Sequence, residues 1–457
     1  MTLLLEKAIV CGLLIAIVFT ALALGTVESW SLAIFELIIV ALLALWAIKV
    51  VLDRGVNIRL PQLVLPLFAL LGLGLIQSVS FRAADGRRIG LSLDIEATRG
   101  TVTVLFFLLA SFIIAVHFFN NRGRLRTMAN FLAIYGLALA MFSLIQYFTW
   151  NGKFYWIRPN TTSIGSFGPF VNRNNFAGYM EMLIPIPVAL ITTRAVRSEL
   201  RLFYAFSAAL MGLALVISLS RGGMIALAAE MIFIAVWSSK ARGRNAAHGI
   251  AGNSKRFALL KKTGAVGAIS LAILAGIIWI GPDKIVGRIA NSGDKGETFY
   301  TNRGWIWRDT LSMIAANPIL GVGLGAYETA YPIYSHSDGS LRVEFAHNDY
   351  LQILADGGIL GGVIAVAFLV MVARAFSRGL NAPDPLVRGI ALGGGAGIFA
   401  LLVHSMLDFN LQIPSNALLF LFLLAAVASA ASLAQSAEQR SPASQHPGRE
   451  FSTPATV

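Results

Sequence analysis

Long apolar runs separated by short polar segments fill most of the chain. A helix of about 17–25 residues crosses the hydrocarbon core of a bilayer, and apolar runs of about this length recur up to position 434. Twelve of them lie at about 3–24, 30–51, 62–79, 101–119, 127–149, 175–193, 203–219, 222–238, 263–281, 349–373, 389–407 and 414–434. The pattern predicts an all-α integral membrane protein with about 12 transmembrane helices, residues 1–434 forming one polytopic membrane domain.

The segment 282–348 is the longest stretch between these runs and is expected to form one larger loop outside the bilayer. Over 298–316 its apolar side chains recur at helical spacing, which predicts an amphipathic helix at the membrane surface. Three glycines between Gly321 and Gly325 then predict a flexible turn. Residues 435–457, rich in Ser, Ala, Pro and Gln, are predicted to be a disordered cytoplasmic tail.

The composition agrees with a membrane protein. Apolar residues make up 56% of the chain and charged residues only 13%, too few to cover the surface of a soluble protein of 457 residues. Cys11 is the single cysteine, so an intrachain disulfide and a thiolate metal cluster are both excluded. The apolar stretch 8–25 exceeds the about 7–15 residues usual in a signal peptide, and we interpret it as a retained first span.

Charge orients the predicted spans. A net charge of +13 would suit a nucleic-acid-binding protein, but basic residues also gather on the inner side of membrane proteins. If the N-terminus lies inside, the inner segments hold 22 of the 36 Lys and Arg residues. This excess predicts that both termini are cytoplasmic and that no nucleic acid is bound. Outer arginines lie near unusual polar and aromatic segments: Arg158, Arg173, Arg221, Arg303, Arg308 and Arg342.

The turn Ser218-Leu-Ser-Arg221-Gly-Gly223 joins two runs that we interpret as a tight hairpin. An arginine at the end of a span can simply extend its charged head to the interface. This turn lies on the predicted outer side, where the positive-inside rule gives no reason for a cation. The glycines also begin the next helix, whose N-terminal amides favour an anion. Since a guanidinium binds phosphate in a bidentate manner, we expect Arg221 to belong to a diphosphate site.

A second polar segment is rich in asparagine and precedes the sixth run. It contains Asn172, Arg173 and Asn175. One asparagine is expected to cap the following helix. The three residues together exceed what a cap needs, so they are candidates for amide and cationic contacts to a sugar or a phosphate.

His347, Asn348 and Asp349 precede the tenth run. A lone histidine is more often a structural hydrogen-bonding residue, but its ordinary pKa near 6.5 suits proton transfer, and carboxylates nearby could fix its tautomer. We therefore treat His347 as a candidate catalytic residue, with Asn348 and Asp349 as candidate substrate contacts. No second histidine stands at i+3 or i+4 and no Asp-x-Asp pair occurs, so no metal is expected.

Ionisable residues also occur inside the apolar runs. His404 and Asp408 stand four positions apart in the eleventh run, and such spacing on a helix places them on one face as a possible supporting pair. Ionisable residues in a span are functional candidates by default, although a purely structural pair is equally plausible. The sequence does not rank the remaining intramembrane acids, which are Glu36, Glu181, Glu230 and Asp356.

These segments together resemble the O-antigen ligase and polymerase superfamily of bacterial envelopes. The resemblance covers about 165–415. Its motifs are Asn172-Arg-Asn-Asn-Phe-Ala177, Ser-Leu-Ser-Arg221-Gly-Gly, Arg303-Gly-Trp-Ile-Trp, Asn317-Pro-Ile-Leu-Gly-Val-Gly-Leu-Gly325, His347-Asn-Asp-Tyr-Leu-Gln-Ile-Leu-Ala-Asp-Gly-Gly-Ile-Leu-Gly361 and Val403-His-Ser-Met-Leu-Asp-Phe-Asn-Leu-Gln-Ile-Pro414. Each motif alone is modest, whereas their order and spacing together are specific.

The resemblance implies twelve spans in the bacterial inner membrane, with a periplasmic loop and an active site that faces the periplasm. It implies a metal-independent, cofactor-independent, inverting glycosyltransferase with a polyprenyl-diphosphate-linked glycan donor, such as an undecaprenyl-diphosphate-linked oligosaccharide. The acceptor would be lipid A-core in a ligase, or a growing glycan in a polymerase of surface polysaccharide. Arg221 and Arg303, with Arg173 nearby, would hold the diphosphate, and His347 would deprotonate or orient the acceptor hydroxyl.

Two other function classes remain open at this stage. A secondary transporter of a small anion or of a lipid-linked sugar would bind its substrate near the membrane midplane, often at broken helices. The polar segments of this chain instead gather at the outer mouth, which favours the enzyme. A non-catalytic scaffold for an envelope assembly complex is the third alternative.

Overall fold

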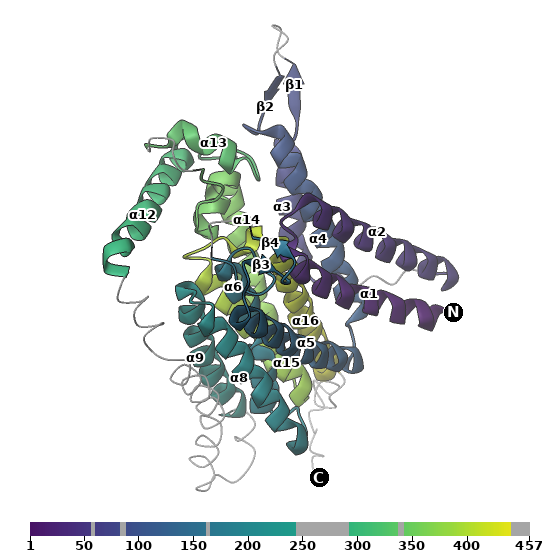
Figure 1. The fold of residues 1–457 in the computed structure, drawn as a ribbon. Coiled ribbons are helices and arrows are strands. Elements are labelled where there is room, and N and C mark those ends of the chain that lie inside the picture. Colours follow the sequence, from purple (N-terminus) through teal and green to yellow (C-terminus); the bar gives the residue numbers. More distant parts are fainter. Residues whose placement is uncertain (56–59, 83–87, 161–164, 244–291, 337–341, 440–457) are drawn as a thin grey trace, which may run out of the picture.

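Apolar helices form most of the computed structural model, which describes residues 1–55, 60–82, 88–160, 165–243, 292–336 and 342–439 (Figure 1). In chain order the elements are α1 Thr2–Leu22, η1 Leu24–Thr26, α2 Ser29–Leu52, α3 Val64–Gln77, β1 Ser80–Arg82, β2 Arg88–Gly90, α4 Ile95–Phe118, α5 Arg122–Phe148, β3 Lys153–Phe154, β4 Arg158–Pro159, α6 Arg173–Leu183, α7 Pro185–Thr192, η2 Ser198–Leu200, α8 Arg201–Ile217, α9 Arg221–Gly243, α12 Ser292–Ala316, α13 Tyr327–Tyr334, α14 Asp349–Leu380, α15 Pro385–His404, η4 Asn410–Gln412 and α16 Pro414–Gln439.

Ten helices of the described chain are long and apolar enough to cross a membrane. They match ten of the twelve runs, and α6 with α7 counts as one span that is interrupted at Pro185, whose nitrogen carries no hydrogen to donate. The run at 62–79 corresponds to α3, a shorter apolar helix. The run at 263–281 lies outside the described residues. The multi-pass helical class is therefore confirmed, while the number twelve is not.

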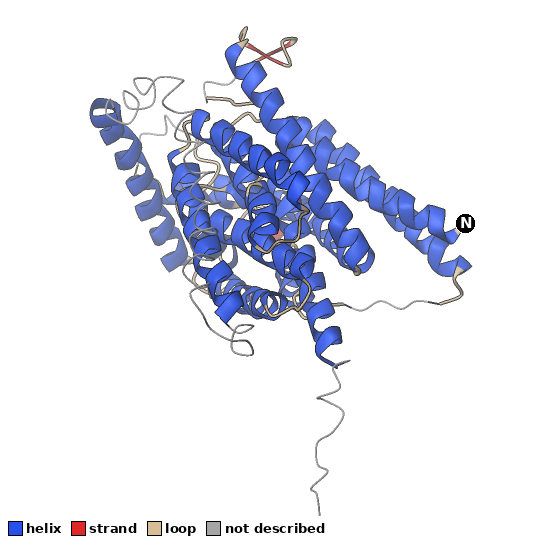
Figure 2. Cartoon of the chain, turned by 90° about the horizontal axis from the view of Figure 1, so that it is seen from below, coloured by secondary structure: helices blue, strands red, loops and turns tan. Residues whose placement is uncertain are grey.

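The bundle is layered around α15 and α16. In the spanning windows of α6–α7, α15 and α16, most positions are buried inside the protein, whereas in α1, α2 and α14 most positions are only partly buried or exposed. Seen from below, the long helices stand side by side, and the N-terminal helix lies at one edge (Figure 2). Exposed apolar side chains on these outer helices are what contact with lipid requires.

Contacts between distant segments agree with the predicted sides of the spans. Glu6 pairs with Lys49 and Arg124, three residues that the charge pattern places on one side. Arg158 pairs with Glu28, and both are predicted on the opposite side. The alternation of the helices is thus reproduced by independent contacts, although contacts within the protein do not reveal which side is cytoplasmic.

The segment after Ser292 forms a compact unit on one end of the bundle. α12 extends over more residues than the predicted helix at 298–316. Its Met313 packs in a small apolar core with Tyr327 and Tyr331 of α13, while its Trp305 and Leu311 are exposed. The helix is amphipathic as expected, but it belongs to a packed unit and not to an isolated surface helix.

The glycine turn at Gly321–Gly325 is fixed by its surroundings, which corrects the prediction of a flexible turn. Gly321 has a φ of 69°, and a Cβ at this position would lie 2.4 Å from the backbone of Asp356. The N–H of Val322 donates to the carbonyl of Ala355 at 2.9 Å. Opposite this turn, α14 is broken at Gly358. Glycine is required because two backbones meet here.

At the C-terminal end, α16 extends to Gln439 and so includes the first residues of the predicted tail 435–457. The rest of that tail, 440–457, lies outside the described residues. The first part of the predicted loop, 282–291, does so as well.

Candidate functional site

Asp408 lies at the centre of the candidate site. It follows the end of α15, and its carboxylate is buried and contacted from three other parts of the chain. The amide of Asn174 on α6 donates to Oδ2 at 2.6 Å, and a guanidinium nitrogen of Arg303 on α12 lies 3.6 Å from Oδ2. Nδ1 of His347 lies 3.5 Å from Oδ1. The structure therefore brings together two residues that the sequence analysis assigned to different tasks, Arg303 and His347.

His347 presents its ring between the carboxylate and solvent. Nδ1 lies nearest Asp408, at an ion-pair distance longer than a normal hydrogen bond, and the side chain is 31% exposed. The edge of the ring packs against Phe409, with centroids 4.8 Å apart and planes at 71°. The backbone has a φ of 50°, a conformation that non-glycine residues rarely adopt outside functional sites or turns.

The position of the carboxylate favours one assignment of the two ring nitrogens. With its hydrogen on Nδ1 and directed to the carboxylate, His347 keeps Nε2 as its basic nitrogen. A neighbouring carboxylate that orients a histidine and stabilises its protonated form is a recurrent arrangement for proton transfer.

Arg303 is placed by the docking of α12 on the segment after α15. Its Nη1 donates to the carbonyl of Leu407, and its side chain is only 13% exposed. One turn further along α12, Trp307 donates its indole N–H to the carbonyl of Ala346 at 3.0 Å. These contacts connect α12 to both sides of the site, the 405–409 segment and the residue that precedes His347.

Two neighbours, His347 and Arg303, govern the charge of Asp408. Burial alone would raise the pKa of this carboxyl, but His347 and Arg303 outweigh burial and lower its pKa to about 2. Asp408 is therefore ionised at any physiological pH. It can stabilise an imidazolium at His347 without accepting the proton itself.

Arg221 begins α9 beside a second buried pair. Nδ1 of His404 lies 3.0 Å from Oε2 of Glu181, and both side chains are almost fully buried. A Cβ at Gly222 would lie 2.5 Å from the ring of His404, so only glycine lets α9 start against this histidine. Ser220 caps the helix by accepting from the N–H of Gly223 at 3.2 Å. Arg221 thus stands at the N-terminus of a helix that begins against His404, and His404 precedes Asp408 by four positions.

The expected pair of His404 and Asp408 is divided in the structure. α15 ends at His404, before the end of the predicted run at 407, and the backbone after it no longer continues a regular helix. Each side chain finds its partners elsewhere, His404 at Glu181 and Asp408 at Arg303 and His347. The spacing of four suggested a common helical face, and that reasoning fails where the helix stops.

The asparagine residues have local tasks. Asn172 caps α6 by accepting from the N–H of Asn174 at 2.9 Å. Asn348 caps α14, accepting from Tyr350 at 3.0 Å, and its own amide donates to Met406. Asn175 is buried, and its carbonyl accepts from Asn416.

Asp349 is buried too, where Oδ2 accepts from the hydroxyl of Ser405 at 2.7 Å. Arg173 is half-buried and begins α6 next to Asn174, the residue that contacts Asp408.

Sequence reasoning missed two members of this site. Asn174 lies inside the Asn-rich segment but was not singled out, because only the fold shows which of three neighbouring asparagines faces Asp408. Glu181 was not ranked above the other intramembrane acids, and its partner His404 stands 223 positions away.

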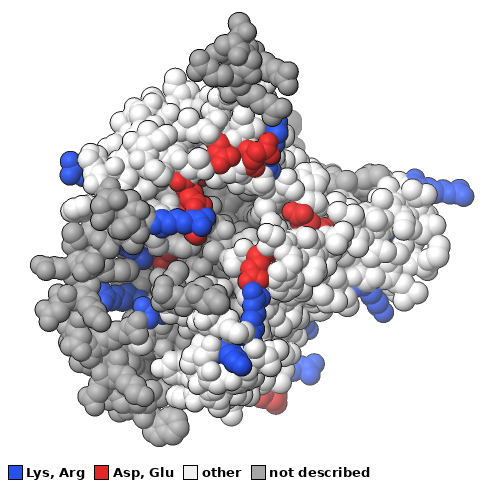
Figure 3. Space-filling model, turned by 45° about the horizontal axis from the view of Figure 1, so that its top comes forward, with Lys and Arg blue, Asp and Glu red and all other residues white. Residues whose placement is uncertain are grey.

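Charged side chains gather around a hollow on the face that is turned forward in Figure 3, whereas most of the surrounding surface is uncharged. Among the described residues, no group of three or more His, Cys, Asp or Glu side chains is arranged to hold a metal ion. The charged and ionisable groups that the structure brings together at the site are Arg303, His347 and Asp408.

Residues 206–366 match the family model described as O-antigen ligase. This match confirms the resemblance to the O-antigen ligase and polymerase superfamily. No curated protein matches the chain. The matched O-antigen ligase region includes Arg221, Arg303 and His347, whereas Asn174 and Asp408 lie outside it. The matched range covers these three residues, and the fold adds the carboxylate that connects two of them.

Proposed function

We propose that the protein is a glycosyltransferase of the O-antigen ligase type that moves a glycan from a polyprenyl-diphosphate carrier to an acceptor hydroxyl. The family match supports a membrane ligase or polymerase, and an enzyme that transfers glycans. The observation that carries the finer proposal is the position of Asp408 between His347 and Arg303. One carboxylate orients a base and a cation toward the same place.

In this proposal His347 is the base. As the acceptor oxygen forms its bond to the anomeric carbon, its proton passes to Nε2 of His347, and Asp408 stabilises the imidazolium. The bond from the anomeric carbon to the phosphate oxygen breaks, and the diphosphate leaves with the electron pair. Attack on the face opposite the leaving group inverts the anomeric configuration.

The diphosphate is assigned to the cationic side of the site. A diphosphate that leaves accumulates negative charge, and guanidinium groups placed beforehand stabilise such charge without a metal. Arg303 and Arg221 are proposed to bind it, with Arg173 nearby and the N-terminus of α9 adding its dipole. An arginine has five N–H donors, so its contact to a carboxylate is compatible with binding a phosphate.

The proposed location follows from the charge pattern. We infer an inner-membrane protein with cytoplasmic termini whose site faces the periplasm, where lipid-linked glycans would be presented. The partners are then the lipid-linked donor, a lipid A-core or growing glycan acceptor, and the bilayer itself. Asn172, Asn175, Asn348 and Asp349 act in this proposal by holding the helix ends that carry the reacting residues.

A genetic test addresses the proposal in cells. Arg221→Ala and His347→Ala should each abolish attachment or lengthening of the surface glycan on gels, while membrane insertion stays normal. Arg374→Ala, on the predicted inner side, is a matched control that should leave the glycan profile unchanged. Wild-type profiles from both site variants would reject the enzyme.

A secondary transporter is the second candidate because of two observations. α14 is broken at Gly358, and both carboxylate oxygens of buried Glu230 lack a hydrogen-bond partner in the described chain. Buried acids and broken helices are typical of transport pathways. Uptake of a lipid-linked sugar or a small anion into liposomes, abolished by Glu230→Gln but not by His347→Ala, would favour transport over transfer.

A further inference from the structure

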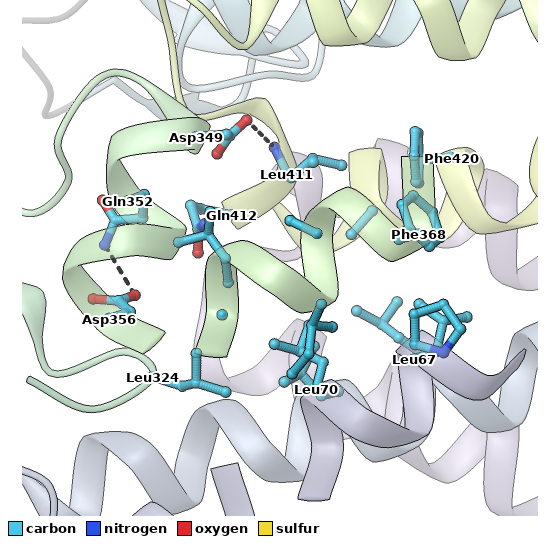
Figure 4. A pocket seen from close by; sticks show the side chains of 18 of the residues that line it. Leu67, Leu70, Leu324, Asp349, Gln352, Asp356, Phe368, Leu411, Gln412 and Phe420 are labelled. Atoms are coloured by element: carbon cyan, nitrogen blue, oxygen red, sulfur yellow. Dashed lines mark hydrogen bonds between the residues drawn. The ribbon is translucent and has the colours of Figure 1, made fainter. Parts of the chain in front are cut away.

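A cavity of about 280 Å³ lies beside the site, between α3, α4, α14 and α16. We call it the α14 groove. Its lining includes Leu67 and Leu70 of α3, Phe368 of α14 and Phe420 of α16, and Figure 4 shows these side chains directed toward one another. Most of the lining is apolar, which suits a hydrocarbon chain.

The groove borders the surface that faces lipid. Ala365 on its wall is half-buried, and its neighbour Val366 is 61% exposed on the outside of α14. On α3, half-buried Leu67 stands next to exposed Phe68. A chain from the bilayer can therefore reach the groove from the side, without passing through water.

The other end of the groove is polar and carries carboxylates. Asp349 and Asp356 line it together with Gln352 and Gln412, and Figure 4 shows these four side chains at the end opposite Phe368. Oδ2 of Asp356 accepts from Gln352 at 3.0 Å, but its Oδ1 is buried and has no hydrogen-bond partner in the described chain. Oδ1 of Asp349 is also without a partner of normal geometry there.

Rigid backbone holds the carboxylate of Asp356 in place. Gln77 of α3 donates to the carbonyl of Asp356 at 2.9 Å and accepts from the N–H of Leu324 at 3.0 Å. The helix break at Gly358 lies two positions beyond Asp356. A buried acceptor that is fixed and unsatisfied selects a ligand that supplies a hydrogen-bond donor.

The polar end adjoins the catalytic candidates. Asp349 stands two positions after His347, and its N–H donates to the carbonyl of Ser405 at 2.9 Å, close to the segment that carries Asp408. No lysine or arginine is among the lining residues described for this groove. A diphosphate head would find no cation among these lining residues and would meet two carboxyl groups instead.

We propose that the α14 groove binds the hydrocarbon chain of an amphiphile other than the diphosphate-linked substrate, whose head group next to the chain is uncharged or cationic and donates hydrogen bonds to Asp356 and Asp349. This inference rests on the groove alone and does not depend on the proposed function.

Photolabelling of the purified full-length protein tests the proposal. The probes are a dodecyl maltoside and a dodecyl phosphate, each with a diazirine in the alkyl chain. The maltoside should label peptides of α14 and α16 around Ala365 and Phe420, and the phosphate of equal chain length should label them more weakly. Asp356→Asn should reduce this preference, because it replaces the carboxyl group at the head-group position by an amide.

Two tryptophan variants give a matched pair. Ala365→Trp fills the groove, and it should lower maltoside labelling about tenfold, the loss expected when about two methylene groups can no longer be buried. Val366→Trp adds the same side chain on the lipid-facing side of α14, and labelling should be unchanged. If Ala365→Trp does not fold, the comparison of the two probes on the wild-type protein still tests the groove assignment.

Equal labelling of both tryptophan variants, or stronger labelling by the phosphate, would overturn the groove assignment. Labelling requires no glycan transfer, so the two proposals can fail separately. Normal labelling of a protein that transfers no glycan would reject the enzyme and retain a groove for a donor-headed amphiphile.

Discussion

Replacing Asp408 by asparagine keeps the size of the side chain and removes the charge that connects His347 to Arg303. The pKa of Asp408 falls from its ordinary 3.8 to about 2, which corresponds to roughly 2 kcal/mol in favour of the carboxylate in its folded surroundings. If the same interaction stabilises the imidazolium at His347 in the transition state, its loss lowers kcat about 30-fold. The KM for the donor should change little, because the arginines remain.

Steady-state transfer by purified D408N, with a polyprenyl-diphosphate oligosaccharide as donor, measures this effect. Asp384→Asn is a suitable control, since Asp384 also pairs with an arginine, Arg122, but at the other end of α15. A folded D408N enzyme with kcat close to that of the wild type would refute the role of Asp408, whatever the effect on donor binding.

Three further outcomes are expected. As the pH falls from about 4 to about 2, Asp408 is protonated and its ion pairs are lost. Wild-type protein in detergent should therefore lose roughly 2 kcal/mol more stability than D408N over this range. Parallel losses of the two proteins in thermal melts would contradict this. Arg303→Ala should lower the transfer rate at least about tenfold, because one charge-assisted contact to phosphate is lost. Arg308→Ala, at an exposed position on α12, should leave the rate unchanged. Equal rates for the two variants would be the contrary result. Gly321→Ala should lower the melting temperature strongly, because the added Cβ would collide with the backbone of Asp356. Gly304→Ala should change it little, because a Cβ there has open space. Similar melting temperatures of the two variants would refute the fixed turn.

Much of the membrane architecture could be predicted because its signal is local. A run of apolar residues becomes a span wherever it stands, since the bilayer permits few alternatives to a helix. Local charge also predicts which span ends share a side, and the pairing of Glu6 with Arg124 agrees with that grouping. The length of α3 could not be predicted in this way, because the apolar run at 62–79 is longer than the helix, which covers only Val64–Gln77.

The site could be predicted only in part because its contacts are not local. Arg221, Arg303 and His347 could each be selected from the sequence, because each is a charged or ionisable residue in a polar segment on the predicted outer side. Their connection through Asp408 depends on the end of α15, and a spacing of four positions in an apolar run gives no sign that the helix stops at His404. The glycine turn was misjudged for the same reason, since the backbone that fixes Gly321 lies on α14, far along the chain.

Product analysis with purified protein tests the central claim most directly. The protein is incubated with a polyprenyl-diphosphate oligosaccharide and, separately, with lipid A-core or a growing glycan as acceptor, and the products are identified by mass spectrometry. We expect the glycan on one of the acceptors together with free polyprenyl diphosphate, and neither product from His347→Ala. An intact donor after incubation with folded wild-type protein and both acceptors would contradict the proposed transfer.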